Sequence, residues 1–143
     1  MVMKCAGEFG NTDDRRFHAQ PIACRDCGPQ LTLVDADGAH IDVAPTGVID
    51  HVAEMLINGE VVGIQGLGGF HVACLASNVD AVARLRTSKF RPSKPFALMM
   101  PSIKAARRIC LVSQTEAKTL SSPEAPIVLL SKRRDVLPEL IAP

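Results

Sequence analysis

The stretch from Val61 to Met100 constrains the fold of this chain more than any other, because glycine and proline divide it into short segments of different character. Its first segment, 61–64, is a short apolar run and predicts a buried strand. The glycine-rich turn Gly66–Gly69 follows, where positive φ and close approach of the backbone to a ligand are permitted. A second extended segment is expected over 70–74.

A helix is expected next, because Ser77 and Asp80 have the spacing of a capping pair and apolar residues then recur at helical intervals. The helix is expected to fail near Arg91, since a following proline disfavours α geometry. The apolar stripe of this helix is formed by Val79, Val82 and Leu85. Two cations, Arg84 and Arg86, are expected to lie off that stripe.

The loop after this helix carries three cations, Lys89, Arg91 and Lys94, and is stiffened by Pro92 and Pro95. Lysine supplies a point charge and arginine a planar fork, so a cationic loop beside a glycine turn suits a polyanion such as a nucleotide phosphate. The alternative is a solvated helix C-terminus, where the helix dipole favours cations. The loop leads into an expected central strand over 96–100.

Composition places the chain among globular proteins and excludes several functions. Of its 143 residues 47% are hydrophobic and 22% charged, and a net charge of +1 provides no global field for nucleic acid or an anionic membrane. The N-terminus lacks the apolar core of a signal peptide, so a cytoplasmic protein is expected. Five cysteines, an odd number, argue against a disulfide framework, and Cys74 and Cys110 lie in apolar surroundings as expected for inert thiols.

Near the N-terminus, Cys24 and Cys27 form a C-x-x-C turn followed by glycine, the geometry of a zinc knuckle. Cys5 lies upstream at the spacing of a structural zinc site whose fourth member falls at position 2, occupied by Val2. Three interpretations are open: a site cut in half where the chain begins, a Cys₃His set completed by His18, or a redox pair. A lone histidine is more often a hydrogen-bonding residue than a ligand.

Elsewhere helices alternate with strands, so the fold class is α/β or α+β with a mixed sheet. Gly59 is a candidate C′ residue, and Ser113 with Glu116 has the capping-box spacing. Asp35 to Gly38 is a predicted turn, and the tail from 131 is expected to run on without a closing element. The remaining elements are expected as helices over 47–58, 102–108 and 113–120 and as strands over 31–34 and 126–130.

Two sets of motifs resemble one family, the HypF carbamoyltransferases of nickel–iron hydrogenase maturation. GLGGFHVAC and LRTSKFRPSKPFALMM resemble the YrdC-like domain of that family, whose K-x-R-x-x-K-P loop is matched by Lys89, Arg91, Lys94 and Pro95. The stretch 14–29 resembles the end of the zinc-finger region of the family, D-R-R-F-H-A-Q-P-x-A-C-x-x-C-G-P. The resemblance runs along almost the whole chain.

The resemblance implies a piece of a larger protein: the end of a zinc-finger region (1–34), a linker (35–46) and the N-terminal part of a YrdC-like domain (47–143). YrdC-like domains are open twisted sheets with a concave basic groove. In the alignment Cys5 is the second cysteine of the first C-x-x-C of the finger, whose first cysteine is missing. The resemblance therefore implies a structural zinc with at most three thiolates, from Cys5, Cys24 and Cys27.

The activity that the resemblance implies is an ATP-dependent carbamoyl transfer. In the family, carbamoyl phosphate and ATP, with Mg²⁺, give carbamoyl adenylate, and the carbamoyl group passes to a cysteine of a partner protein to become a cyanide ligand of the hydrogenase. No catalytic residue is assigned. The candidate nucleotide- and phosphate-binding residues are Lys89, Arg91, Lys94, Gly68, Gly69 and His71.

Two positions depart from the family pattern: Leu75 stands where an aspartate is usual, and Gln65 where a lysine is frequent. The YrdC-like domain of the family runs on beyond the segment that matches this chain, so the chain alone is expected not to complete the reaction. The alternative function is a module that binds double-stranded RNA, to which YrdC-like folds have been linked. The near-neutral charge and the lack of Trp and Tyr argue against it.

Overall fold

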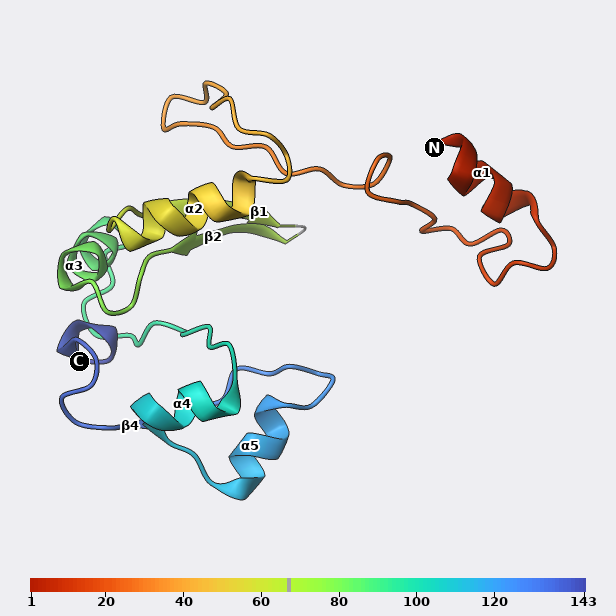
Figure 1. Cartoon of the computed structure of the whole chain (residues 1–143). Helices are drawn as coiled ribbons and strands as arrows, with labels where there is room; N and C mark the ends of the chain where they lie inside the picture. The colour runs from red at the N-terminus through yellow and green to blue at the C-terminus, as the bar shows by residue number, and fades with distance from the viewer. Residues whose placement is uncertain (67) are drawn as a thin grey trace. The chain divides into compact units, whose positions relative to one another are not determined.

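The computed structural model describes residues 1–66 and 68–143, which fall into two compact units, Met1–His51 and Val52–Pro143 (Figure 1). The described strands form two separate antiparallel pairs, so the expected combination of helices and strands is present, with small sheets in place of one continuous mixed sheet. Among the described helices none is long and apolar enough to cross a bilayer.

The first unit contains α1, Met3–Gly10, a helix that the sequence pattern did not predict. Its N-cap residue, Val2, provides no side-chain hydrogen bond, and two of the eight helical residues are glycines. Neither capping nor intrinsic propensity therefore marks the helix in the sequence. The residue that α1 buries is Cys5.

A tight reversal follows the cysteine turn, as predicted for Asp35 to Gly38. The carboxylate of Asp35 accepts the N–H groups of Asp37 and Ala39 over 2.9 Å each, and Gly38 has a φ of 86°. The strand expected over 31–34 is wrong in extent, because the described pairing is one bridge between Val34 and His40 across this reversal.

Helix α2, Val48–Ile57, begins in the first unit, continues into the second and confirms the predicted helix. The N–H groups of Gly59 and Glu60 donate back into the last turn over 3.1 and 2.9 Å, the two bonds of a Schellman motif. Gly59 has a φ of 87°, and an added Cβ would lie 2.6 Å from Nδ2 of Asn78. The predicted C′ position thus requires glycine both for its conformation and for space.

Strands β1, Val62–Gly66, and β2, Gly69–Ala73, pair as an antiparallel hairpin with Val62 opposite Ala73 and Gly66 opposite Gly69. Both predicted extended segments are therefore confirmed, and the predicted glycine turn joins them; its Leu67 lies outside the described residues. The predicted burial of the first strand is wrong in part, since Val62 is buried but the other four residues of β1 are exposed.

Helix α3, Val79–Ser88, carries much of the apolar core of the second unit. Val82 and Leu85 are buried as the stripe predicted, whereas Val79 is 55% exposed. The placement of Arg86 off the buried face is wrong: this side chain is 8% exposed and lies within the core.

Both ends of α3 are capped. The N-cap residue is Asn78, one position after the predicted Ser77, and its side-chain oxygen accepts the N–H of Ala81 over 2.9 Å. At the C-terminus the N–H groups of Phe90 and Arg91 donate back into the last turn over 3.0 and 3.1 Å, a second Schellman motif. Phe90 occupies the left-handed position of that motif with a φ of 46°, where glycine is usual.

The remainder of the second unit follows the loop after α3, and its two α-helices each begin one residue after the predicted start, at positions 103 and 114. Ser102 accepts the N–H of Ala105 over 3.1 Å, and Ser113 and Glu116 form the predicted capping box. Strands β3 and β4 pair antiparallel, and η1 packs on α3. These elements are α4 Ile103–Ile109, β3 Cys110–Leu111, α5 Gln114–Leu120, β4 Ser131–Lys132 and η1 Glu139–Ile141.

Two predicted strands and the predicted open tail are wrong. Residues 96–100 and 126–130 form no strand, because a strand needs a partner ladder and the N–H of Phe96 instead donates to the carbonyl of Ile141 in η1 over 3.0 Å. Ile127 is 83% exposed, against its predicted burial. The tail closes on the core through Ile141, which is 5% exposed.

The two Schellman motifs predict opposite effects of exchanging their left-handed residues. Gly59→Ala is expected to lower the free energy of unfolding by at least about 1 kcal/mol, because alanine is strained at positive φ and its Cβ meets Asn78. Phe90→Gly is expected to raise it by up to about 1 kcal/mol, since Phe90 carries that strain and its side chain is 92% exposed. Urea denaturation followed by circular dichroism measures both.

The control for this pair is Gly63→Ala, because an added Cβ there meets nothing within 4 Å and the φ of Gly63 is not positive. It is expected to leave the unfolding free energy nearly unchanged. A Gly59→Ala protein as stable as Gly63→Ala would contradict the assignment of the α2 C-terminus.

The capping box of α5 predicts a pH dependence. Hydrogen bonds from the side chain and backbone of Ser113 hold the pKa of Glu116 below its ordinary value. The contribution of the box is therefore present above the ordinary glutamate pKa and is lost as pH falls through the lowered one. In Ser113→Ala the pKa of Glu116 is expected to rise, which a carboxyl carbon NMR titration measures. An unchanged titration of Glu116 would contradict the role of the serine.

Candidate functional site

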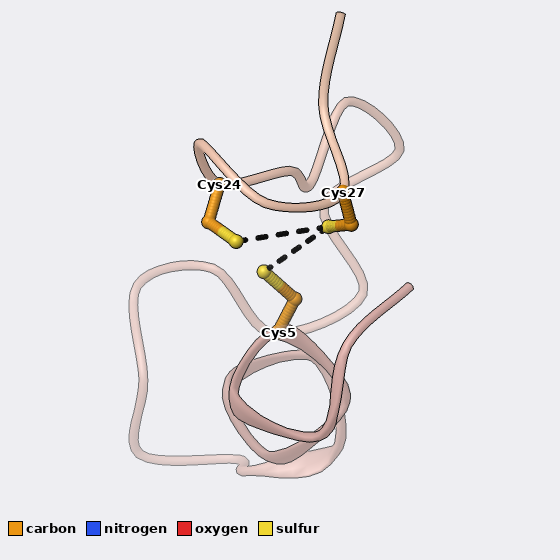
Figure 2. A group of neighbouring side chains, drawn as sticks. All are labelled: Cys5, Cys24 and Cys27. Atoms are coloured by element: carbon orange, nitrogen blue, oxygen red, sulfur yellow. Dashed lines mark hydrogen bonds between the residues drawn. The ribbon is translucent and has the colours of Figure 1, made fainter. Parts of the chain in front are cut away.

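Three thiols meet in the first unit: the Sγ atoms of Cys5, Cys24 and Cys27 all lie within 4.8 Å of one another (Figure 2). The Sγ of Cys27 lies 3.8 Å from that of Cys24 and 3.7 Å from that of Cys5. Around a tetrahedral zinc with Zn–S bonds of about 2.3 Å, sulfur atoms lie about 3.8 Å apart. The predicted ligands are thus brought together at the spacing that zinc requires.

The turn from Cys24 to Cys27 depends on the glycine that follows it. The N–H of Gly28 donates to the carbonyl oxygen of Cys24 over 2.7 Å. A Cβ on Gly28 would lie 2.7 Å from that same oxygen, so no larger residue fits without moving the turn. The turn therefore carries both thiols on one side, opposite Cys5 on α1 (Figure 2).

The segment between α1 and the cysteine turn is fastened to the helix. Arg16 forms an ion pair with Glu8 of α1 over 2.6 Å and donates to the carbonyl of Ala23 over 2.7 Å, next to the turn. The ring of His18 stacks on that of Phe9 with centroids 4.7 Å apart. The interpretation in which His18 completes the metal site is wrong for the described arrangement, because the thiol cluster does not include it.

The thiols of Cys5 and Cys27 differ in their protonation equilibria. Burial raises the pKa of the Cys5 thiol to about 11. Backbone hydrogen bonds from Val2 and Cys24 lower the pKa of Cys27 to about 7. The backbone of Val2 therefore lies beside the cluster, at the sequence position where a fourth cysteine is expected.

The three predicted phosphate-binding cations stand together on the loop after α3. Lys89 and Lys94 are exposed, whereas Arg91 is half-buried with its guanidinium carbon 5.5 Å from the ring centroid of Phe96. The Nε atom of Arg91 is buried and has no hydrogen-bond partner among the described residues. The loop thus presents two exposed lysine charges on either side of a half-buried arginine.

The backbone of this loop is held by Arg86, which sequence reasoning missed. Its Nη1 donates to the carbonyl oxygens of Arg91 and Lys94, the second over 3.3 Å, and its Nε donates to that of Leu140 over 2.8 Å. Its guanidinium carbon lies 4.5 Å from the centroid of the Phe96 ring. No local pattern signals such a residue, because its partners lie in other segments.

The predicted hairpin residues lie apart from Lys89. A hollow of about 430 Å³ is lined by Val61 and Val72 at the open end of the hairpin, by the C-terminal part of α3 and by Lys89, which follows that helix. Gly69 lies at the other end of β2, three residues before Val72, which corresponds to about 10 Å at the rise of a strand. His71 is exposed and, by the alternation of side chains, points to the opposite face of the hairpin from Val72. Gly68 belongs to the same distant end.

Family models match both parts of the chain. The HypF finger matches residues 3–34, and the Sua5/YciO/YrdC family, described as telomere recombination, matches residues 54–143. The second match covers more than half of the chain. This chain belongs to the Sua5/YciO/YrdC family. The HypF finger precedes the YrdC-like part, as the motifs of the sequence indicated.

Similar proteins carry the HypF name. The carbamoyltransferase HypF of Rhodobacter capsulatus is 50% identical over 143 residues, which are 100% of this chain and 18% of that protein. A solved HypF from T. kodakarensis superposes with a TM-score of 0.86 at 40% identity, covering 100% of this chain and 18% of that one. A full-length HypF in a phosphate- and nucleotide-bound form gives 0.81 at 41% identity, with 99% and 18% coverage. The chain thus spans about a fifth of these relatives.

The YrdC-like part contains two further thiols, Cys74 and Cys110. Burial raises the pKa of both, against a smaller opposing effect of Arg84 and Arg133 respectively. A raised pKa keeps a thiol protonated near neutral pH and lowers its reactivity. The predicted inert character of these two cysteines agrees with this direction.

The thiol cluster of the HypF finger predicts metal binding that depends on three residues. Cys24→Ala is expected to abolish stoichiometric binding of Zn²⁺, because it leaves two thiolates, whereas Cys74→Ala is expected to leave binding unchanged. Val2→Cys is expected to strengthen binding, since its backbone already lies at the cluster. Competition with a metal chelator measures the affinities. Equal affinities of Cys24→Ala and Cys74→Ala would contradict the site.

Proposed function

We propose that this chain forms part of a HypF-type carbamoyltransferase that acts in nickel–iron hydrogenase maturation, and that its YrdC-like part binds the phosphates of ATP. The observation that carries the proposal is the loop 89–95, whose exposed lysines stand on a backbone fixed by the buried guanidinium of Arg86. A related HypF has been solved in a phosphate- and nucleotide-bound form, and such ligands have the charge that this loop is suited to receive.

The finger part has a structural role in this proposal. A zinc ion held by Cys5, Cys24 and Cys27 supplies a cross-link between α1 and the cysteine turn. The ion pair of Arg16 with Glu8 orients the segment that joins them before any metal arrives. The finger residues therefore organise their own unit and take no part in the chemical step.

The reaction proposed for the whole enzyme is the formation of carbamoyl adenylate. An oxygen of carbamate, derived from carbamoyl phosphate, attacks the α-phosphorus of ATP; a P–O bond forms, the α–β P–O bond breaks and pyrophosphate leaves. Such a step depends on in-line placement and on neutralising the phosphate charge rather than on a side-chain nucleophile. Lys89, Arg91 and Lys94 provide the neutralisation, with Mg²⁺ accompanying ATP.

Gly68, Gly69 and His71 are assigned to a second part of the same ligand. All three are exposed on the hairpin that precedes α3, so they are open to contact with a ligand. Because the chain spans about a fifth of its HypF relatives, the hydrolysis of carbamoyl phosphate and the transfer to a cysteine of a partner protein are assigned to other parts of HypF.

The loop predicts ATP binding that two lysines dominate. The affinity for ATP is measured by isothermal titration into the 143-residue chain and into the double variant Lys89→Ala, Lys94→Ala. The double variant is expected to lose at least about tenfold in affinity for each lysine removed, because a hydrogen bond to a charged group contributes about 1.5–3 kcal/mol. The matched control is Lys104→Ala, Lys118→Ala, which removes the same charge from exposed sites on α4 and α5.

Equal losses in the two double variants would show that net charge, and not the loop, attracts the nucleotide. Double-stranded RNA binding stays a prediction from the family. A titration of RNA with a steep dependence on salt, together with no selective binding of ATP, would favour that alternative.

A further inference from the structure

We propose that Arg86 is the positioning residue of the phosphate-binding loop: its buried guanidinium sets the backbone of Arg91 and Lys94 against η1, and so fixes the spacing of the loop cations. The proposal rests on the proposed function of the loop. Arg86 itself touches no ligand, because it is 8% exposed and lies behind the loop.

One planar group joins two segments that are distant in sequence. On the loop side, Nη1 of Arg86 donates to the carbonyl oxygens of Arg91 and Lys94. On the side of η1, Nε donates to the carbonyl oxygen of Leu140 over 2.8 Å, and Nη2 donates to that of Ile141 over 3.4 Å. The N–H of Phe96 donates to the carbonyl of Ile141 over 3.0 Å and closes the arrangement. Two carbonyl groups of the loop and two of η1 thus meet at one side chain.

The identity of the held residues distinguishes a positioning role from general packing. The loop carbonyls that Arg86 binds belong to Arg91 and Lys94, two of the three residues whose side chains face the ligand in the proposed function. A carbonyl fixed in place restricts the Cα of its residue, and therefore the origin of its side chain. One nitrogen of Arg86, Nη1, therefore sets the spacing between the backbones of these two cationic residues, while Nε and Nη2 fix the guanidinium against η1.

Arginine suits this position for a geometric reason. Its planar guanidinium presents N–H groups in fixed directions and lies 4.5 Å from the centroid of the Phe96 ring. Lysine has three donors on a single nitrogen and no plane to pack on the ring. Because its described acceptors are neutral carbonyls, the charge of Arg86 also remains behind the loop, where burial reduces its screening by salt.

The first test compares ATP affinity in Arg86→Met, Arg86→Lys and Arg84→Met. Arg84 is the control, since it lies on the same helix and lines the hollow beside Lys89, but donates to the carbonyl of Gly59 and not to the loop carbonyls that Arg86 holds. Arg86→Met is expected to bind ATP at least about tenfold more weakly than the unmodified chain, and Arg84→Met is expected to stay within about twofold of it. The ATP affinity of Arg86→Lys is expected to lie between those of Arg86→Met and the unmodified chain. Circular dichroism establishes which variants are folded at the temperature of the titration.

The second test needs no nucleotide, and therefore separates this proposal from the proposed function. Hydrogen exchange of the Phe96 and Ile141 amides, both hydrogen-bonded in the structure, is expected to speed up together in Arg86→Met and to stay unchanged in Arg84→Met. If the unmodified chain binds neither ATP nor inorganic phosphate, the proposed function fails, and exchange alone decides whether Arg86 holds the loop.

The proposal is overturned if folded Arg86→Met keeps the exchange rate of Phe96, or binds ATP as tightly as Arg84→Met. Should Arg86→Met not fold, Arg86→Lys decides, because it keeps the charge and loses the fork. Weaker ATP binding with an unaltered melting temperature supports the positioning role. An equal change in all amides of the second unit, with unchanged ATP affinity, indicates a residue that only stabilises the core.

Discussion

A guanidinium group buried among carbonyl oxygens is the interaction on which the second unit depends. Removing a full charge from water costs several kcal/mol unless the group is well paired. Arg86 meets this cost with carbonyl acceptors from two segments and with its place in the last turn of α3, where the helix dipole favours a cation. Without Arg86, these carbonyl oxygens would lose the hydrogen-bond donor that they have in the structure. The loop and the C-terminal turn therefore exist in this form because one side chain satisfies both.

The two units reach order by different means. Between residues 1 and 47 the buried residue is Cys5, so the first unit has little apolar core to offset the entropy of fixing its loops. It relies on specific links instead, among them the ion pair of Arg16 with Glu8 and the thiol cluster. A small domain of this kind is stabilised by metal, whose binding energy becomes folding energy. The second unit packs Val82, Leu85 and Ile141 at α3, and adds the hydrogen bonds of Arg86 to this apolar core.

The sequence predicted what is encoded locally. The capping box of α5, the left-handed glycine after α2 and the cysteine turn each depend on a few neighbouring residues, and Ser113, Gly59 and Gly28 could be interpreted correctly. The loop cations were predicted from their residue types and the flanking prolines, and their role in binding phosphate stays a prediction. The same reasoning failed for α1, which has no cap, and for the hydrophobic segments 96–100 and 126–130, since composition does not say whether a strand finds a partner. Arg86 was misplaced for the same cause: its acceptors lie as far away as Leu140.

The length of that connection has a consequence for synthesis on the ribosome. Arg86 and Ile141 are separated by 55 positions, so the arginine is made long before its partners in η1. At about 5–20 residues per second the interval is roughly 3–11 seconds. During this time the helix and the cationic loop exist, but the carbonyls that fix the guanidinium from behind do not. The nascent chain therefore emerges with its loop unset, and the loop takes the shape seen in the structure only when η1 docks against Arg86.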